Sequence, residues 1–231
     1  MTFIRTERIL VVAAHPDDEV LGCGATIAKY TKAGVRVSVL LLGEGPLSRY
    51  EKREEGLQQK DVVGVPSFIE RASHILGVEK VFTFQFPDNK FDTVPLLELV
   101  KTVAQVKEAL QPTIIFTHHR ADLNIDHRLT HQAVITVCRP IEGETVREIY
   151  SWENPSSTEW SYPNMFQPNM FMNVHDTLAK KIEALRCYET EVRTFPHPRS
   201  EEALRALAAW RGSTAGIRTA EAFEVVRIIA P

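Results

Sequence analysis

The apolar residues of the chain fall into two alternating patterns. Continuous or alternating apolar runs, which are typical of strands, occur at residues 9–12, 35–42, 81–86 and 113–117. Between them, apolar residues recur every three or four positions, most clearly over 68–77 and 96–110, which predicts amphipathic helices. Strand and helix in regular alternation predict an α/β protein with a doubly wound, mostly parallel sheet.

The second half of the chain is less regular. Residues 147–152 predict an edge strand, and the stretch 154–171, rich in proline, serine, asparagine and aromatic residues, predicts a long loop. Two more helices are expected over 176–189 and about 201–210, and a last strand over 223–229. Earlier in the chain, the charge-rich segment 48–60 is typical of a helix or a mobile loop.

Length and composition restrict the class of protein. A chain of 231 residues suits one α/β domain, so we expect residues 1–231 to form a single domain. Hydrophobic content is 44%, charged content is 25% and the formal net charge is −3, which describes an ordinary globular protein. No tract is rich in Lys and Arg, so we expect no nucleic-acid partner.

The cysteines and the start of the chain bear on its compartment. Cys23, Cys138 and Cys187 are odd in number and far apart, which argues against a disulfide framework and a zinc knuckle. The first eight residues lack the apolar core of a signal peptide, and no apolar run reaches membrane-spanning length. We therefore expect a cytoplasmic protein without a membrane partner.

A dense group of ionisable residues follows the first apolar run, in Ala13-Ala14-His15-Pro16-Asp17-Asp18-Glu19. Ligands bind at the carboxyl ends of strands in open α/β sheets. An imidazole and a carboxylate three positions apart, His15 and Asp18, can bind one divalent cation on a turn that Pro16 stiffens. Two adjacent carboxylates crowd their charge unless one is a ligand, which leaves Asp17 free as a base. The simpler alternative is that these acids only favour a helix N-terminus.

A second polar cluster, residues 118–128, follows the fourth apolar run. His127 lies at the expected start of a helix over 129–137, and therefore at the same edge of the sheet as the first motif. It can complete a three-ligand site with His15 and Asp18, which leaves positions for water and substrate, as a catalytic metal requires.

Three other histidines near this cluster have simpler explanations. His131 is one helical turn after His127 and could share a metal with it, but a helix that turns into the sheet carries His131 away from the first motif. His118 and His119 are expected as hydrogen-bonded histidines at a strand end rather than as ligands.

The chain thus combines Ala14-His15-Pro16-Asp17-Asp18-Glu19, Gly22-Cys23-Gly24 and Asp122-Leu123-Asn124-Ile125-Asp126-His127. Together these segments resemble the PIG-L (LmbE-like) family of metal-dependent N-deacetylases, and weaker matches at 86–88 and 220–223 extend the resemblance over most of the chain. The resemblance implies a Rossmann-like three-layer α/β/α domain that binds a divalent metal, usually zinc, with ferrous iron as the alternative. It also implies a hydrolase that removes acetyl from a small N-acetylglucosamine-type sugar or sugar conjugate.

The resemblance also implies roles for single residues. His15, Asp18 and His127 would be the metal ligands, and Asp17 would be the general base. Glu19 would lie behind the ligands or at the helix start.

The chain departs from the family at Asn124, where many members carry a histidine that assists at the oxyanion or the leaving group. An amide can donate a hydrogen bond to an oxyanion but cannot act as a proton donor. Either Asp17 makes both proton transfers, or another residue such as His197 supplies the acid. Arg53 is a candidate for the family's substrate-binding arginine, and Asp88, at a strand end, could hold sugar hydroxyls.

Two loops carry side chains suited to a substrate. His197 and Arg199 form a pair that fits an anionic or polyhydroxyl compound, although Ser200 before two glutamates also predicts an ordinary helix cap. In the stretch 154–171, aromatic residues either stack on a sugar or serve in packing or self-association, which makes a homo-oligomer an open expectation. They are Trp160, Tyr162 and Phe166.

Three other functions share part of this pattern. A nucleotide-binding module with Gly22-Cys23-Gly24 as its phosphate loop lacks a third glycine at Ile27, and the acids just upstream would repel phosphate. A metal-dependent hydrolase of another amide, such as a thiol conjugate or an antibiotic acyl amide, fits the motifs equally well. A metal-binding protein without catalysis is disfavoured by the presence of Asp17.

Overall fold

The computed structural model describes residues 7–163 and 165–230. Residues 1–6, on which part of the signal-peptide expectation rests, lie outside this range. The described residues form seven strands, which are β1 (Arg8–Ala13), β2 (Arg36–Gly43), β3 (Lys80–Phe86), β4 (Ile114–His118), β5 (Glu148–Trp152), β6 (Met170–Asn173) and β7 (Ala220–Ile228).

The α-helices are α1 (Asp18–Lys32), α2 (Arg53–Gly56), α3 (Lys60–Val63), α4 (Val65–Leu76), α5 (Leu96–Leu110), α6 (Ile125–Val137), α7 (Leu178–Leu185) and α8 (Glu201–Thr214). Short 3-10 turns add η1 (Leu47–Arg49), η2 (Phe91–Thr93) and η3 (Thr158–Trp160). None of the described helices is long and apolar enough to cross a membrane.

All seven strands form one sheet in the order β3-β2-β1-β4-β5-β7-β6. The first five strands in this order pair in parallel, and β7 pairs antiparallel with both β5 and β6. The predicted fold class, an α/β protein with a mostly parallel sheet, is confirmed. The prediction of an edge strand at 147–152 is wrong, because β5 lies between β4 and β7.

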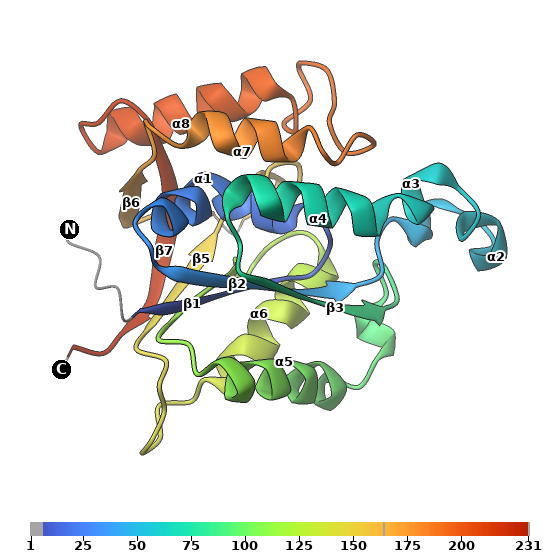
Figure 1. The fold of residues 1–231 in the computed structure, drawn as a ribbon, viewed down its shortest axis with the longest axis horizontal. Coiled ribbons are helices and arrows are strands. Elements are labelled where there is room, and N and C mark those ends of the chain that lie inside the picture. The colour runs from blue at the N-terminus through green and yellow to red at the C-terminus, as the bar shows by residue number, and fades with distance from the viewer. Residues whose placement is uncertain (1–6, 164, 231) are drawn as a thin grey trace.

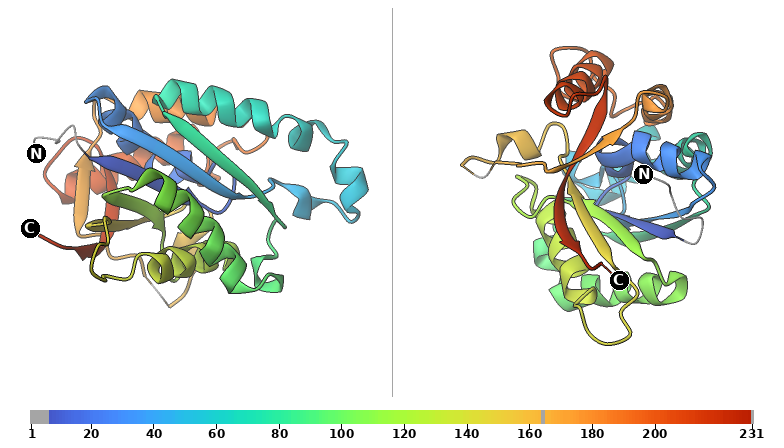
Figure 2. Two further views of the ribbon diagram at one scale, coloured as in Figure 1. Left: turned by 60° about the horizontal axis from the view of Figure 1, so that its bottom comes forward. Right: turned by 90° about the vertical axis from the view of Figure 1, so that its left-hand side faces the viewer.

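Helices cover both faces of this sheet, as Figure 1 shows. On one face, α1 and α4 pack on β1 and β2, and α7 packs on α1 and α4. On the other face, α5 and α6 cover the sheet. Figure 2 shows α5 and α6 from a second direction, on the opposite side of the sheet from α4.

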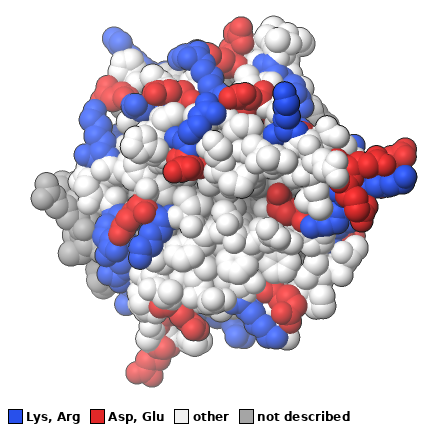
Figure 3. All heavy atoms as spheres, turned by 45° about the vertical axis from the view of Figure 1, so that its right-hand side comes forward, with Lys and Arg blue, Asp and Glu red and all other residues white. Residues whose placement is uncertain are grey.

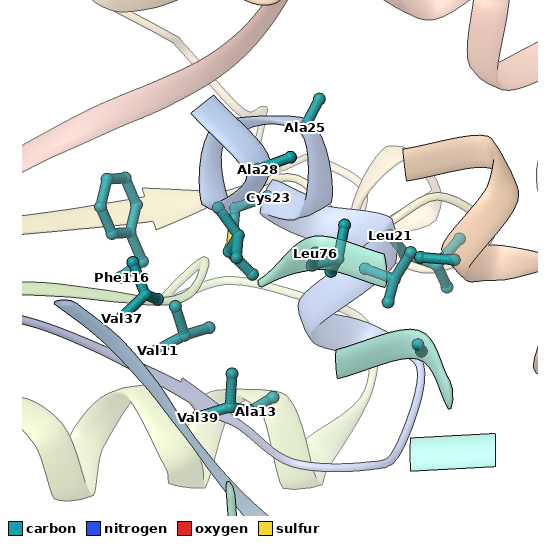
Figure 4. Packing of buried hydrophobic residues seen from close by; sticks show 14 of the residues in the cluster. Val11, Ala13, Leu21, Cys23, Ala25, Ala28, Val37, Val39, Leu76 and Phe116 are labelled. Carbon is teal, nitrogen blue, oxygen red and sulfur yellow. The ribbon is translucent and has the colours of Figure 1, made fainter. Parts of the chain in front are cut away.

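The apolar runs read from the sequence form the core between these layers. Val11 and Ala13 of β1 and Val37 and Val39 of β2 point toward α1, whose Cys23 is labelled with them in Figure 4. Their neighbours in β1, Leu10 and Val12, belong to the cluster on the other face. Alternate residues of the same strand thus serve opposite cores, which is why these runs are continuously apolar.

The helix α1 is broken at Cys23, whose φ and ψ of −144° and 22° are not helical. The break frees backbone groups, and two distant elements satisfy them. The Glu221 carboxylate of β7 accepts hydrogen bonds from the N–H groups of Ala25, at 3.1 Å, and Thr26, at 2.6 Å. The Lys181 ammonium of α7 donates to the Leu21 carbonyl and to Glu221, both at 2.7 Å. The Glu221 carboxylate therefore lies at the start of the second part of α1, where the phosphate of a bound nucleotide would have to lie.

Of two irregular segments, one contains more structure than the sequence pattern predicts and the other contains only short helical turns. The stretch 154–171, predicted as a loop, contains η3 and the start of β6. The strand β6 forms because it pairs with β7, with Met170 opposite Phe223. The segment 48–60, predicted as a helix or a mobile loop, contains α2, part of η1 and the first residue of α3, and it lies between β2 and α4. In Figure 1 and in the left view of Figure 2 this excursion projects at the right-hand end of the molecule.

Candidate active site

The first motif and the second cluster meet at the carboxyl edge of the sheet. The strand order reverses between β1 and β4, since β2 and β3 lie on one side of this pair and β5 lies on the other. Such a switch point leaves a crevice for ligands. His15 follows β1 and His127 follows β4, and both line one cleft.

A strained turn sets the direction of the first motif. Asp17 precedes α1 with φ 107° and ψ −28°, a backbone conformation that L-residues rarely adopt. Its carbonyl accepts hydrogen bonds from the N–H groups of Val20 and Leu21. Its own N–H donates to the buried Glu19 carboxylate, whose other oxygen accepts from the Tyr188 hydroxyl. Glu19 therefore supports the turn from behind, at the helix start.

Three side chains bring candidate metal-ligand atoms within 4.8 Å of one another: His15, Asp18 and His127. Asp18 Oδ2 lies 3.3 Å from His15 Nδ1 and 3.3 Å from His127 Nε2. The other Asp18 oxygen accepts a hydrogen bond of 2.9 Å from the amide of the buried Asn154. Two imidazoles and a carboxylate make a donor set that fits a divalent transition metal. The structure thus brings together the three predicted ligands.

A second carboxylate lies behind each imidazole. Asp126 Oδ2 lies 2.9 Å from His15 Nε2, and Asp122 Oδ1 lies 3.0 Å from His127 Nδ1. Such carboxylates orient a ligating histidine and raise its basicity. Asp126 is also near Asp88, and these two with His15 form another group of ligand-type atoms on the far side of that imidazole. Asp122 and Asp126 both belong to the second sequence motif, and the sequence alone predicts no role for either.

The charges in this group stabilise one another. Burial alone lowers the pKa of His127, but the Asp18 and Asp122 carboxylates outweigh burial and raise it to about 9. Burial alone raises the pKa of Asp18, but the His127 and His118 imidazoles outweigh it and hold that pKa well below its usual range. Asp18 is therefore an anion facing imidazoles, which is the charge state that a metal ligand needs.

Asp17 faces the same cleft and is held by Arg199. Arg199 Nη1 donates to Asp17 Oδ2 at 2.8 Å and to Glu191 Oε2 at 3.0 Å, and its Nε donates to the Ser156 hydroxyl at 2.8 Å. Burial raises the pKa of Asp17 well above its usual range, against the opposing effect of the Arg199 guanidinium. A carboxylate with a raised pKa is a stronger base near neutral pH. From the sequence alone, Arg199 is expected only as a substrate group.

Some of the residues predicted to contact substrate line the cleft, and others do not. Asp88 and Asn124 line the cleft with the predicted ligands. Asp88 accepts hydrogen bonds from the backbone and hydroxyl of Ser48. The Asn124 side chain accepts from the Asp126 N–H as the N-cap of α6 and donates to Asn89 Oδ1, both at 2.8 Å.

Arg53 and His197 lie outside the residues that line the cleft. Arg53 forms a two-pronged ion pair with Glu44. His197 Nδ1 accepts a hydrogen bond of 3.1 Å from the Arg199 N–H, which helps to shape the loop that carries Arg199. Their assignment to the substrate stays a prediction.

The neighbouring histidines have structural partners. His118 is fully buried, stacks on His127 with ring centroids 3.9 Å apart, and accepts a hydrogen bond from the Ala14 N–H at 2.9 Å. His131 Nδ1 lies 2.9 Å from the His118 carbonyl oxygen. These contacts agree with the expectation that His127 alone, rather than the His127 and His131 pair, joins the first motif.

The aromatic side chains of the stretch 154–171 do not line the cleft. Trp160 and Tyr162 are 46% and 84% exposed, and neither lines the cleft. The Phe166 ring packs edge-on against His119 and under the Arg211 guanidinium, which serves packing.

Comparison with known proteins identifies the family. A family model described as PIG-L, GlcNAc-PI de-N-acetylase, matches residues 10–138, a span that contains both motifs. The chain belongs to the PIG-L family. Membership confirms the resemblance and makes the chain a de-N-acetylase of the hydrolase class, and the His15, Asp18 and His127 group fits the metal dependence of PIG-L enzymes.

One curated relative of this PIG-L chain is the diacetylchitobiose deacetylase of Thermococcus kodakarensis, 26% identical over 97% of this chain and 85% of the relative. Among solved structures, the conserved protein TT1542 of Thermus thermophilus is 25% identical, covers 96% of both chains and has a TM-score of 0.76. GalB of Pseudomonas putida KT2440, a 4-carboxy-2-hydroxymuconate hydratase, is 21% identical over 98% of both chains, with a TM-score of 0.76. At 21% identity the likeness to GalB shows the fold alone. The hydratase reaction in the name of GalB belongs to that protein.

Proposed function

We propose that the protein is a zinc-dependent hydrolase that removes the N-acetyl group from a small N-acetylglucosamine-type sugar or sugar conjugate. The observation that carries this proposal is the placement of Asp17 beside His15, Asp18 and His127 in one cleft. A buried base next to a metal donor set suits hydrolysis of an unactivated amide. The deacetylase relative from Thermococcus, named for an N-acetylated disaccharide, supports the substrate class.

His15, Asp18 and His127 would hold the ion. When bound, a divalent cation supplies Lewis-acid polarisation of the acyl carbonyl and lowers the pKa of water from 15.7 toward about 7. Two nitrogen donors and one oxygen donor suit zinc, and they also suit ferrous iron. Metal analysis of the purified protein distinguishes these ions.

Asp17 performs the proton transfers in this proposal. Its carboxylate takes a proton from the attacking water and returns it to the leaving nitrogen, which releases the amine and acetate. Arg199 fixes the orientation of this carboxylate through its 2.8 Å hydrogen bond. Asn124 cannot supply a proton, and His197 does not line the cleft, so Asp17 is the best placed acid for the second step.

Asn124 and Asp88 serve the rest of the substrate. One N–H of the Asn124 amide donates to Asn89, which leaves its second N–H to donate to the developing oxyanion. Asp88 is 7% exposed and lines the cleft beside Ser48 and Asn89, where it can accept hydrogen bonds from sugar hydroxyls.

Acetate release from a panel of N-acetylated sugars, sugar nucleotides and pseudodisaccharides tests the proposal. Release that a chelator abolishes and zinc restores is expected for at least one compound. Absence of release from every compound by protein loaded with one equivalent of metal would refute it. The alternative, hydrolysis of another amide, would then be tested with thiol conjugates and long-chain acyl amides.

A further inference from the structure

A second hollow of about 300 Å³ adjoins the catalytic cleft. It lies under the excursion formed by α2 and α3 and against the edge strand β3. The face turned forward in Figure 3 takes in the side of Figure 1 where this excursion lies, and it shows a broad central area without Lys, Arg, Asp or Glu. Nine of the fourteen residues that line the hollow are apolar, among them Leu47, Leu57, Val63, Val65, Ile69 and Phe84.

The hollow and the cleft share walls. Pro16, between the ligand His15 and the base Asp17, lines both. The loop after β2 divides its residues between them: positions 45, 46, 48 and 49 line the cleft, while positions 43, 44 and 47 line the hollow. A substrate with its amide at the metal ligands therefore has the hollow beside it, one side chain away.

The charges of the hollow are neutralised within the protein. Arg53 is its only Lys or Arg, and both ends of its guanidinium pair with Glu44, its only Asp or Glu. Glu44 is almost buried, with 6% of its side chain exposed, so the pair is held in place. An anionic substituent would find no unpaired cation among the residues of this hollow.

Two of the apolar side chains at the hollow are open to solvent, and others form a buried wall behind them. Leu57 is 48% exposed and Val63 is 65% exposed, while Val65 and Ile69 are each 8% exposed. Exposed apolar groups around a depression next to a catalytic site are typical of a ligand-binding surface. Burial of an alkyl or aryl group here removes apolar surface from water on both partners.

We propose that this hollow, formed by the apolar side chains of the β2–α4 segment and β3, binds an uncharged alkyl or aryl substituent of the substrate. The inference rests on the proposed amidase function of the neighbouring cleft. It assigns the substrate an apolar group. Carried as the aglycone, this group narrows the N-acetylated sugars proposed above; carried as a longer acyl chain in place of acetyl, it would point to the alternative, hydrolysis of another amide.

Two substrate series test this inference. In one, the 1-O-alkyl group of an N-acetylglucosaminide grows from methyl to butyl to hexyl; in the other, the N-acyl group of the methyl glycoside grows from acetyl to hexanoyl. Each methylene that enters the hollow is expected to raise kcat/KM by about threefold to fourfold. At least a tenfold gain from methyl to hexyl, or from acetyl to hexanoyl, supports the inference and tells which end of the substrate occupies the hollow. A flat response in both series overturns it.

Matched variants locate the effect. Leu57→Asp and Val63→Asp place a charge in the hollow at exposed positions, where folding tolerates it, and are expected to abolish the chain-length gain while hydrolysis of the methyl glycoside is unchanged. Leu97→Asp, at a 58% exposed leucine on α5, is the control and should keep the full gain. A gain that survives both variants in the hollow would contradict the inference.

Calorimetric binding of the hexyl and methyl glycosides separates this inference from the proposed function. Tighter binding of the hexyl compound that Leu57→Asp removes, without acetate release from any compound, would refute the function and retain the hollow. Equal hydrolysis and equal binding of the two compounds would retain the function and refute the hollow.

Discussion

The catalytic cleft and the apolar hollow adjoin at one edge of the sheet but are built in opposite ways. In the cleft, Asp17, Asp18 and His127 are 3%, 1% and 2% exposed, and Asp17 and Asp18 are held by hydrogen bonds from distant segments. In the hollow, Leu57 and Val63 are about half exposed or more and come from helices or turns of a few residues. Proton transfer and charge stabilisation need fixed directions, whereas apolar contact is non-directional. Directional hydrogen bonds are therefore concentrated in the cleft, where the proposed reaction would take place.

The largest effect is expected from Asp17→Asn, which keeps the shape of the side chain and removes its basicity. Turnover should fall by roughly 10³-fold, within the usual range for loss of a general base. Metal content, measured by elemental analysis, should stay at the wild-type level because Asp17 is not among the predicted ligands. Unchanged turnover would remove Asp17 from its assigned role.

The second-largest effect is expected for Asp122, whose carboxylate lies behind the predicted ligand His127. Asp122→Asn should weaken zinc binding by about 10- to 100-fold, because the amide carries no charge to orient and polarise His127. Competition with a chromophoric chelator measures this affinity. Asp92→Asn, at an exposed aspartate, is the control and should bind zinc as the wild type does. Equal affinities of the two variants would show that Asp122 does not support the ligand.

A smaller effect, with a pH signature, is expected at Arg199. Arg199→Gln should lower kcat by about 10- to 100-fold through misorientation of the base. Because the guanidinium opposes the burial that raises the pKa of Asp17, its removal raises that pKa further. Activity requires the ionised carboxylate, so the acid limb of the kcat/KM profile should move to higher pH. Arg199→Lys, which keeps the charge, should leave the limb near its wild-type position; a shift to lower pH in Arg199→Gln would contradict the assignment.

The smallest effect is expected for Arg53, which lines the hollow rather than the cleft. Arg53→Gln keeps a hydrogen-bond donor for Glu44 and should change kcat/KM for the methyl glycoside by less than about fivefold, because the Arg53 side chain is 51% exposed and does not line the cleft. A loss of a hundredfold or more would instead restore Arg53 as a direct substrate ligand and blur the distinction between the two regions.

The parts of the site that are local in sequence could be predicted from it. His15, Asp17 and Asp18 lie within four residues, and their place after a buried strand already puts them at the edge where ligands bind. His127 follows from the same argument applied to the fourth apolar run. The doubly wound sheet follows from the alternation of apolar runs and amphipathic helices.

The parts that depend on long-range contacts could not be predicted in this way. Asn154 reaches Asp18 across 136 positions and Arg199 reaches Asp17 across 182 positions, and neither carries a periodic or motif signal. The inner position of β5 also depends on a distant segment, because β7 returns antiparallel beside it. Single side chains in irregular loops are placed by tertiary packing, which local pattern does not encode.

The break in α1 has a consequence for the order in which the molecule can be assembled. Helix α1 is among the first elements of the fold to leave the ribosome, yet the N–H groups of Ala25 and Thr26 lack their acceptor until Glu221, 196 and 195 positions later, has been made. A nascent chain that stops before β7 lacks this cap, and it also lacks the strand that pairs with β5. The capping of α1 at its break is thus tied to β7, so the helix that follows the His15–Asp18 turn is completed only after β7 has been synthesised.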